Sequence, residues 1–192
     1  AIFDAETMEL VYSSGNDMES LTAQYLPDYF NCSNDNVALD DRSQKKGPEV
    51  ESVTLGQVGD ATYAFVGLER IGGVMVYDIT DPTNPSYVNY INSRDFSEDI
   101  AGDVSPEGLC FIPASQGQDA LLLSACEVSG TVAVYTLSEG TAQPENPDNP
   151  GDTETPDTPV TPDDSDNAGA GQSTDTTQQG TESQIPQEGA VQ

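Results

Sequence analysis

The fold is decided by one stretch, residues 47–92, which reads GPEVESVTLGQVGDATYAFVGLERIGGVMVYDITDPTNPSYVNYIN. It contains four apolar runs rich in valine, tyrosine and isoleucine, and glycine, aspartate or proline separates each run from the next. Runs of this length and composition predict β-strands, and the short polar breaks predict tight turns between them. Residues 47–92 are therefore expected to form a four-stranded antiparallel sheet.

A second copy of this pattern begins 58 residues later and matches the first without a gap over about 30 positions. An internal repeat made of strands indicates sheets packed side by side, and a repeat of this length fits one blade of a β-propeller. The aligned pairs are Pro48/Pro106, Glu49/Glu107, Glu69/Glu127, Gly72/Gly130, Val76/Val134 and Tyr77/Tyr135.

The fold class predicted for residues 1–138 is all-β, a partial β-propeller of about two and a half four-stranded blades. Residues 2–14 would supply the outer strands C and D of one blade, residues 47–92 a complete blade, and residues 106–137 strands A to C of the next. A closed ring of four to eight blades would need more than twice this length. We therefore expect the remaining blades of the same propeller as partners, and bare apolar faces and strand edges on this piece.

Composition changes sharply near residue 139. From residue 140 onward there are eleven acids, no base and no aromatic residue, together with seven of the chain's 13 prolines. Such a segment buries too little apolar surface to offset its ordering entropy. Residues 139–192 are therefore predicted to be a disordered acidic tail, a Pro/Thr/Asp-rich stalk or linker.

Charge excludes several classes of partner. The chain of 192 residues has 34 acidic and 5 basic residues and no histidine, a formal net charge of −29. Nucleic acid and anionic membrane surfaces repel such a chain, whereas cations and a salty or extracellular medium suit it. No apolar run reaches the ~18 residues that direct membrane insertion requires. A Ser-His-Asp or Cys-His mechanism is excluded because histidine is absent.

The three cysteines show no CxxC spacing, so a zinc or redox site is not expected. Cys110 and Cys126 stand in apolar runs and are expected to pack as small apolar side chains. Because the two strands should be neighbours, a disulfide between these residues stays open as an alternative.

Several motifs then resemble a known family. The run KKGPEVESVTLG, the motifs GLERIGG and RDF, and SPEGLCFI resemble the choice-of-anchor I domain, a family of secreted bacterial β-propellers. That family is similar to the mesenchyme-specific cell-surface glycoproteins of echinoderms, which are associated with biomineral deposition, and VYDITDPTNP resembles an LVIVD-type repeat. The resemblance implies an extracellular or cell-surface location, with the signal and the anchor expected outside this sequence. It implies no established activity.

Strand direction brings carboxylates together in this arrangement. Strand A of a blade starts where its antiparallel neighbour B ends, so glutamates at both positions should gather on one face near the mouth of the central channel. The polar loops 16–47 and 92–106 should lie on the same face. Hard cations prefer such oxygen ligands, which predicts a Ca²⁺ or Mg²⁺ site. The candidate metal ligands are Glu49, Glu69, Glu107 and Glu127 from the strands and Asp95, Asp99 and Asp103 from the second loop.

Structural roles compete with the metal hypothesis. Glu69 and Glu127 could instead accept backbone N–H groups or pair with Arg70 and Arg94, and the chain has no DxDxDG calcium loop. Arg94 could either orient an anionic substrate group or form a structural ion pair.

Two classes of function fit these features. The first is a non-catalytic binding or adhesion module, secreted or on the cell surface, that recognises cations, a matrix component or another surface protein. The alternative is a calcium-dependent hydrolase of propeller fold, of phosphoesterase or lactonase type. The acidic composition, the missing histidine and the resemblance favour the first, so no catalytic residue and no cofactor other than Ca²⁺ is assigned.

Overall fold

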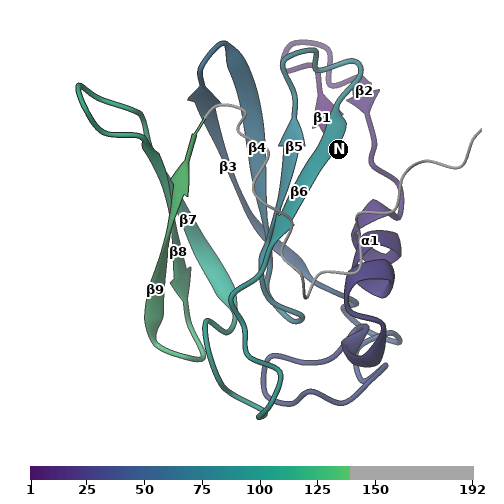
Figure 1. The fold of residues 1–192 in the computed structure, drawn as a ribbon. Coiled ribbons are helices and arrows are strands. Elements are labelled where there is room, and N and C mark those ends of the chain that lie inside the picture. The colour runs from purple at the N-terminus through teal and green to yellow at the C-terminus, as the bar shows by residue number, and fades with distance from the viewer. Residues whose placement is uncertain (139–192) are drawn as a thin grey trace, which may run out of the picture. The chain divides into compact units, whose positions relative to one another are not determined.

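A computed structural model describes residues 1–138 (Figure 1), which form three antiparallel sheets and one short α-helix. The predicted disordered tail, residues 139–192, lies outside the described residues. The strands are β1 (Ile2–Phe3), β2 (Leu10–Tyr12), β3 (Val50–Val58), β4 (Ala61–Leu68), β5 (Val74–Asp78), β6 (Ser86–Ile91), β7 (Pro106–Ile112), β8 (Ala120–Cys126) and β9 (Thr131–Leu137), and the helices are α1 (Asp17–Tyr25) and the 3₁₀ turn η1 (Pro27–Tyr29).

Each sheet is a simple meander in which consecutive strands pair. The orders are β1-β2, β3-β4-β5-β6 and β7-β8-β9, and every pairing is antiparallel. The predicted β-rich class is therefore confirmed, and so is the four-stranded sheet expected from residues 47–92. Turn residues set this topology, since short polar breaks between apolar runs leave the chain no room for a crossover.

One helix stands where a polar loop was expected. α1 has Asp17 and Glu19 in its first turn, where negative charge interacts favourably with the helix dipole. Met18 and Leu21, three residues apart, pack against the apolar cluster beneath them. The prediction of strands and loops alone was wrong here, because the segment has too few apolar residues for a clear helical period. Packing against the sheet stabilises the helix.

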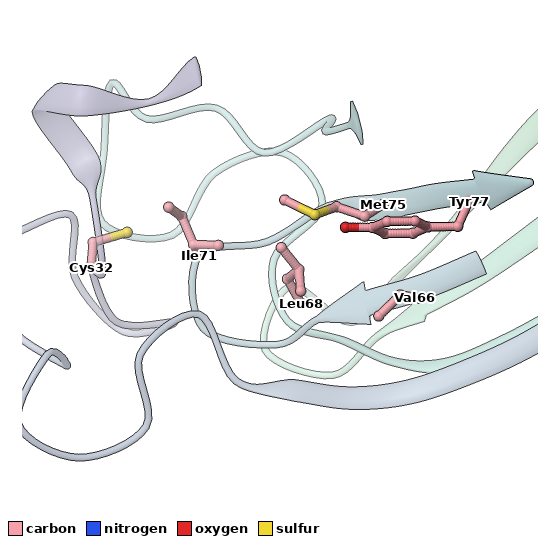
Figure 2. Packing of buried hydrophobic residues seen from close by; sticks show 6 residues of the cluster. All are labelled: Cys32, Val66, Leu68, Ile71, Met75 and Tyr77. Atoms are coloured by element: carbon pink, nitrogen blue, oxygen red, sulfur yellow. The ribbon is translucent and has the colours of Figure 1, made fainter. Parts of the chain in front are cut away.

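Both faces of the sheet β3–β6 carry apolar clusters. The neighbours Phe65 and Val66 of β4 point to opposite faces, as alternation along a strand requires. Figure 1 shows α1 on one side of this sheet and the sheet β7–β9 on the other. The cluster on the side of α1 consists of Cys32, Val66, Leu68, Ile71, Met75 and Tyr77 (Figure 2), and the cluster on the side of β7–β9 consists of Phe65, Val74, Val76 and Leu122.

The two larger sheets approach closely at one glycine. A Cβ atom added to Gly56 would lie 2.3 Å from the ring of Phe111, well inside van der Waals contact. That ring stacks on Phe65 with 5.9 Å between centroids. Strands β3 and β4 therefore lie against β7, and the absence of a side chain at Gly56 makes room for the aromatic pair.

The cysteines differ from expectation. All three are free; Cys32 and Cys126 are buried, but Cys110 is exposed, so its predicted packing role is wrong. Cys110 lies opposite Leu123, whereas Cys126 lies opposite Pro106, four residues along β7. That separation of about 13 Å is too long for a disulfide.

Candidate metal centre

The backbone places glutamates where two antiparallel strands meet. In the first sheet the Glu69 N–H donates to the Glu49 carbonyl at 2.8 Å, just before β3 and just after β4. In the second sheet the Glu127 N–H donates to the Ser105 carbonyl at 2.9 Å. Both sheets therefore end in the same arrangement, and because β7 lies beside β3 and β4, these ends are brought together.

This geometry changes the register of the internal repeat. Glu49 is the structural equivalent of Ser105, since both bond to the glutamate after the second strand and both have a positive φ, 51° and 70°. Glu107 is then equivalent to Glu51. Each of these two is an extra residue opposite the end of its partner strand, in the register shifts between Val50 and Ser52 and between Pro106 and Gly108. Along the first strand of each sheet, the gapless sequence alignment is therefore wrong by two residues, because it pairs Glu49 with Glu107 although Glu51 is the structural equivalent of Glu107.

Two groups of carboxylates result. Carboxylate oxygens of Glu69, Glu107 and Glu127 lie within 4.8 Å of one another, and so do those of Glu49, Glu51 and Glu69. Glu69 is buried and belongs to both groups, while Glu107 and Glu127 are exposed. The sequence interpretation missed Glu51, which a two-residue gap in the repeat would have aligned with Glu107.

Arg70 partly neutralises the first group. Its Nε donates to Glu49, which Lys46 also contacts, and its Nη2 lies 3.2 Å from a Glu69 oxygen. Asn34 donates to Glu69 at 2.9 Å. Burial opposes ionisation of Glu49, but Lys46 and Arg70 outweigh it and lower its pKa. Burial raises the pKa of Glu69, helped by the charge of Glu49 and opposed by Arg70. The ion pair with Arg70 expected in the structural alternative is therefore present for Glu69.

The second group keeps a surplus of negative charge. Within the described residues, Glu107 and Glu127 make no ion pair, and repulsion from Glu127 raises the pKa of Glu107. Five carboxylates in the two groups face only two cations, Lys46 and Arg70, which leaves three formal negative charges. A divalent cation would relieve the repulsion that the two basic side chains leave in place.

The loop aspartates lie elsewhere. Asp95 accepts the Ser97 N–H at 2.9 Å, and Asp99 accepts the Val37 N–H at 3.3 Å. Asp103 accepts the hydroxyl groups of Ser93 and Thr131 at 2.7 and 2.6 Å. The structure brings none of the three aspartates into either glutamate group, because hydrogen bonds to donors outside those groups hold their side chains.

Arg94 binds backbone carbonyls, and the ion pair expected for it is not found among the described residues. It is buried, and its guanidinium donates to four backbone carbonyls at 2.8 to 3.1 Å, while lying over the ring of Phe96. Within residues 1–138 it pairs with no carboxylate. The carbonyls are those of Ser33, Asn36, Arg70 and Asp99, so Arg94 joins the loops 16–47 and 92–106.

Replacing Glu107 with glutamine tests the repulsion directly. The folded-state pKa of Glu107 is raised, so folding is favoured below its unfolded pKa of about 4.3, and this contribution is lost as pH rises through the folded pKa. In calcium-free buffer, Glu107→Gln should raise the urea midpoint at pH 7 and leave it unchanged at pH 3. The control Glu9→Gln, at an exposed site outside both glutamate groups, should change neither. An equal shift at both pH values would contradict the repulsion.

The chain was compared with known proteins, and its helices were searched for membrane spans. In the part of the chain that the structure describes, no helix is long and apolar enough to cross a membrane. Gigasin-3a of Magallana gigas is 28% identical over 153 residues, which cover 70% of this chain and 54% of that protein. The chain thus spans about half the length of this curated relative. No solved structure matches the chain.

The family comparison agrees with the motifs that first indicated it. Residues 1–82 match the choice-of-anchor I domain, a span that includes β1 to β5, α1 and the glutamates of the first carboxylate group. A match to this domain indicates a cell-surface or extracellular protein. Over residues 1–82 the chain is therefore similar to the choice-of-anchor I domain family.

Proposed function

We propose that this chain is part of a non-catalytic, extracellular β-propeller module that binds Ca²⁺ through Glu69, Glu107 and Glu127. The bound ion would in turn support adhesion to a matrix component or another surface protein. The observation that carries the proposal is the convergence of three carboxylates from two sheets within 4.8 Å. Two ligands of one Ca²⁺, each 2.3–2.6 Å from the ion, can be about 4.6–5.2 Å apart at most, so this spacing suits a shared ion.

The propeller arrangement is supported by the way the sheets pack. Each larger sheet is a meander, and the first strands of the two, β3 and β7, lie beside each other. Neighbouring blades place their inner strands in this way around a central axis. Further blades of the same propeller are the partners that this arrangement would require.

Calcium is favoured over magnesium by the irregular donor set. Glu107 and Glu127 are exposed carboxylates. Asn34 and Arg70 both contact Oε1 of Glu69. Ca²⁺ accepts six to eight oxygens in flexible geometry and would complete its shell with water, whereas Mg²⁺ demands near-ideal octahedral positions. Glu49 is already occupied by Lys46 and Arg70, so it is not expected to be a ligand.

A calcium titration by calorimetry tests the proposal. We expect a dissociation constant of about 10⁻⁴ to 10⁻³ M, as in other extracellular modules. Glu107→Gln and Glu127→Gln should each weaken binding at least about tenfold, since each removes one charged ligand. Glu9→Gln also removes one negative charge, but at a site outside the two glutamate groups, so it should leave calcium binding intact. The absence of binding at millimolar calcium, or equal losses in all three variants, would contradict the proposal.

The hydrolase alternative would use the same glutamates around the ion. The calcium-loaded protein is therefore also assayed with phosphoester and lactone substrates. Turnover that depends on calcium and disappears in Glu127→Gln would replace the non-catalytic proposal with the enzymatic one.

A further inference from the structure

A basic side chain of the protein already occupies the first carboxylate group. The Nε of Arg70 donates to Glu49, its Nη2 lies 3.2 Å from Oε1 of Glu69, and its Nη1 donates to Oδ1 of Asn34. Carboxylate oxygens of Glu49, Glu51 and Glu69 lie within 4.8 Å of one another, which is a spacing that one divalent ion could bridge. The guanidinium therefore contacts two of the three carboxylates that a metal ion would need there.

The second sheet lacks this ion pair. Ser105 takes the place of Glu49, as the matching backbone bond and positive φ show. Val128, one residue after the glutamate that follows the second strand, stands at the place of Arg70. The acid and the base are therefore replaced together by neutral residues. This joint replacement indicates that Glu49 and Arg70 act as a unit, and it leaves the second carboxylate group without an equivalent guanidinium.

Glu69 connects the two groups and uses only one of its oxygens for protein contacts. The residue is 5% exposed, and Asn34, Ser105 and Arg70 all contact its Oε1. Within residues 1–138, no donor forms a hydrogen bond with its Oε2. A buried carboxylate oxygen without a donor carries a desolvation cost that a bound cation would offset. Glu69 can therefore bind one metal ion while Arg70 remains at its other oxygen.

Formal charge limits the number of ions that the joined groups can hold. Five carboxylates and two basic side chains leave three negative charges, and one bound Ca²⁺ would leave a single negative charge. Without Arg70 four negative charges would remain, which two divalent ions would neutralise. Two ions in adjoining groups repel each other, so the second ion needs this additional negative charge.

We propose that Arg70 determines how many metal ions this site holds: its guanidinium is the resident cation of the first carboxylate group and excludes a second ion from it. The joined groups therefore bind a single Ca²⁺, through Glu69, Glu107 and Glu127. This inference rests on the proposed calcium site and adds the residue that sets its stoichiometry. Arg70 acts here through the carboxylates that it occupies and is not itself a ligand of the ion.

Equilibrium dialysis of the full chain against radioactive calcium counts the bound ions. The free calcium is about 10 mM, above the dissociation constants of extracellular calcium modules. Arg70→Gln should bind one calcium ion more than the parent. Lys45→Gln, which removes one positive charge at an exposed site outside both groups, should bind the parent's number. Glu49→Ser combined with Arg70→Val copies the second sheet and should also bind the parent's number, because the first group then loses a ligand together with its counter-ion.

The proposal is overturned if Arg70→Gln binds the parent's number of ions, if Lys45→Gln gains as many, or if the double variant gains one. Should Arg70→Gln be unfolded in calcium-free buffer, the same calcium concentration is expected to restore the parent's circular dichroism spectrum, because the bound ion replaces the guanidinium. Failure to restore it would also overturn the proposal. A parent that binds no calcium would contradict the proposed calcium site, whereas an ion gained only in Arg70→Gln would still support exclusion by Arg70.

Discussion

Replacing Arg94 with alanine is expected to lower the free energy of unfolding by about 3–4 kcal/mol. Arg94 is 5% exposed and donates to the carbonyls of four residues in three separate segments. Removing the guanidinium leaves those carbonyls without their donor, and each unsatisfied buried group costs about 1–3 kcal/mol, less where water can enter. The ring of Phe96 also loses its contact with the cation.

Urea denaturation followed by circular dichroism measures this loss. The matched control is Lys45→Ala, which removes one positive charge from an exposed loop position and should change stability by no more than about 0.5 kcal/mol. Arg94→Lys should recover only part of the loss, since an ammonium group cannot reach four carbonyls in the fork geometry of a guanidinium. A loss below about 1 kcal/mol in Arg94→Ala would show that the loops 16–47 and 92–106 do not depend on this residue.

Adding one methyl group at Gly56 is expected to destabilise the protein by about 2–3 kcal/mol, at the upper end of the usual cost of overpacking. The new Cβ atom would lie 2.3 Å from the Phe111 ring. The contacted ring atoms include Cγ, which is bonded to Cβ and moves little when the ring rotates, so the ring cannot move aside without shifting β7 or its stacking on Phe65. The two sheets would therefore separate or tilt.

Gly108→Ala on β7 is the matched control. Its added Cβ would meet its nearest neighbour, the Cβ of Ala125, at an ordinary 3.5 Å, so a change within about 0.5 kcal/mol is expected. A double-mutant cycle with Phe111→Ala isolates the clash, and we expect a coupling energy of about 1–2 kcal/mol between the two sites. If Gly56→Ala destabilises the parent and the Phe111→Ala variant equally, the close approach is not the cause.

Strand positions could be predicted because they depend on local patterns. Each apolar run between residues 50 and 137 became a strand, and glycine or proline at the breaks set antiparallel pairing between neighbours. The helix α1 could not be predicted in this way. Its pattern is weak, and Met18 and Leu21 pack against a cluster to which the distant strands β4 and β5 contribute Val66, Leu68, Met75 and Tyr77.

Only part of the carboxylate site could be predicted in the same way. Glu69 and Glu127 were placed by topology alone, because the end of one strand must meet the start of its antiparallel neighbour. Glu51 was missed because a register shift, which no periodicity reveals, aligns it with Glu107. Asp95 was wrongly grouped with the glutamates because its own loop supplies the donor that holds it.

The strands, their antiparallel order and the gathering of acidic residues at one end of the sheets can all be read from the amino-acid sequence. These follow from side-chain alternation and turn chemistry, which act over a few residues. The folded chain was needed to find which acids share one site, which of them Arg70 neutralises, and that Arg94 binds carbonyls in place of a carboxylate. Those outcomes depend on distances between segments far apart in the chain, and burial and charge act through such distances.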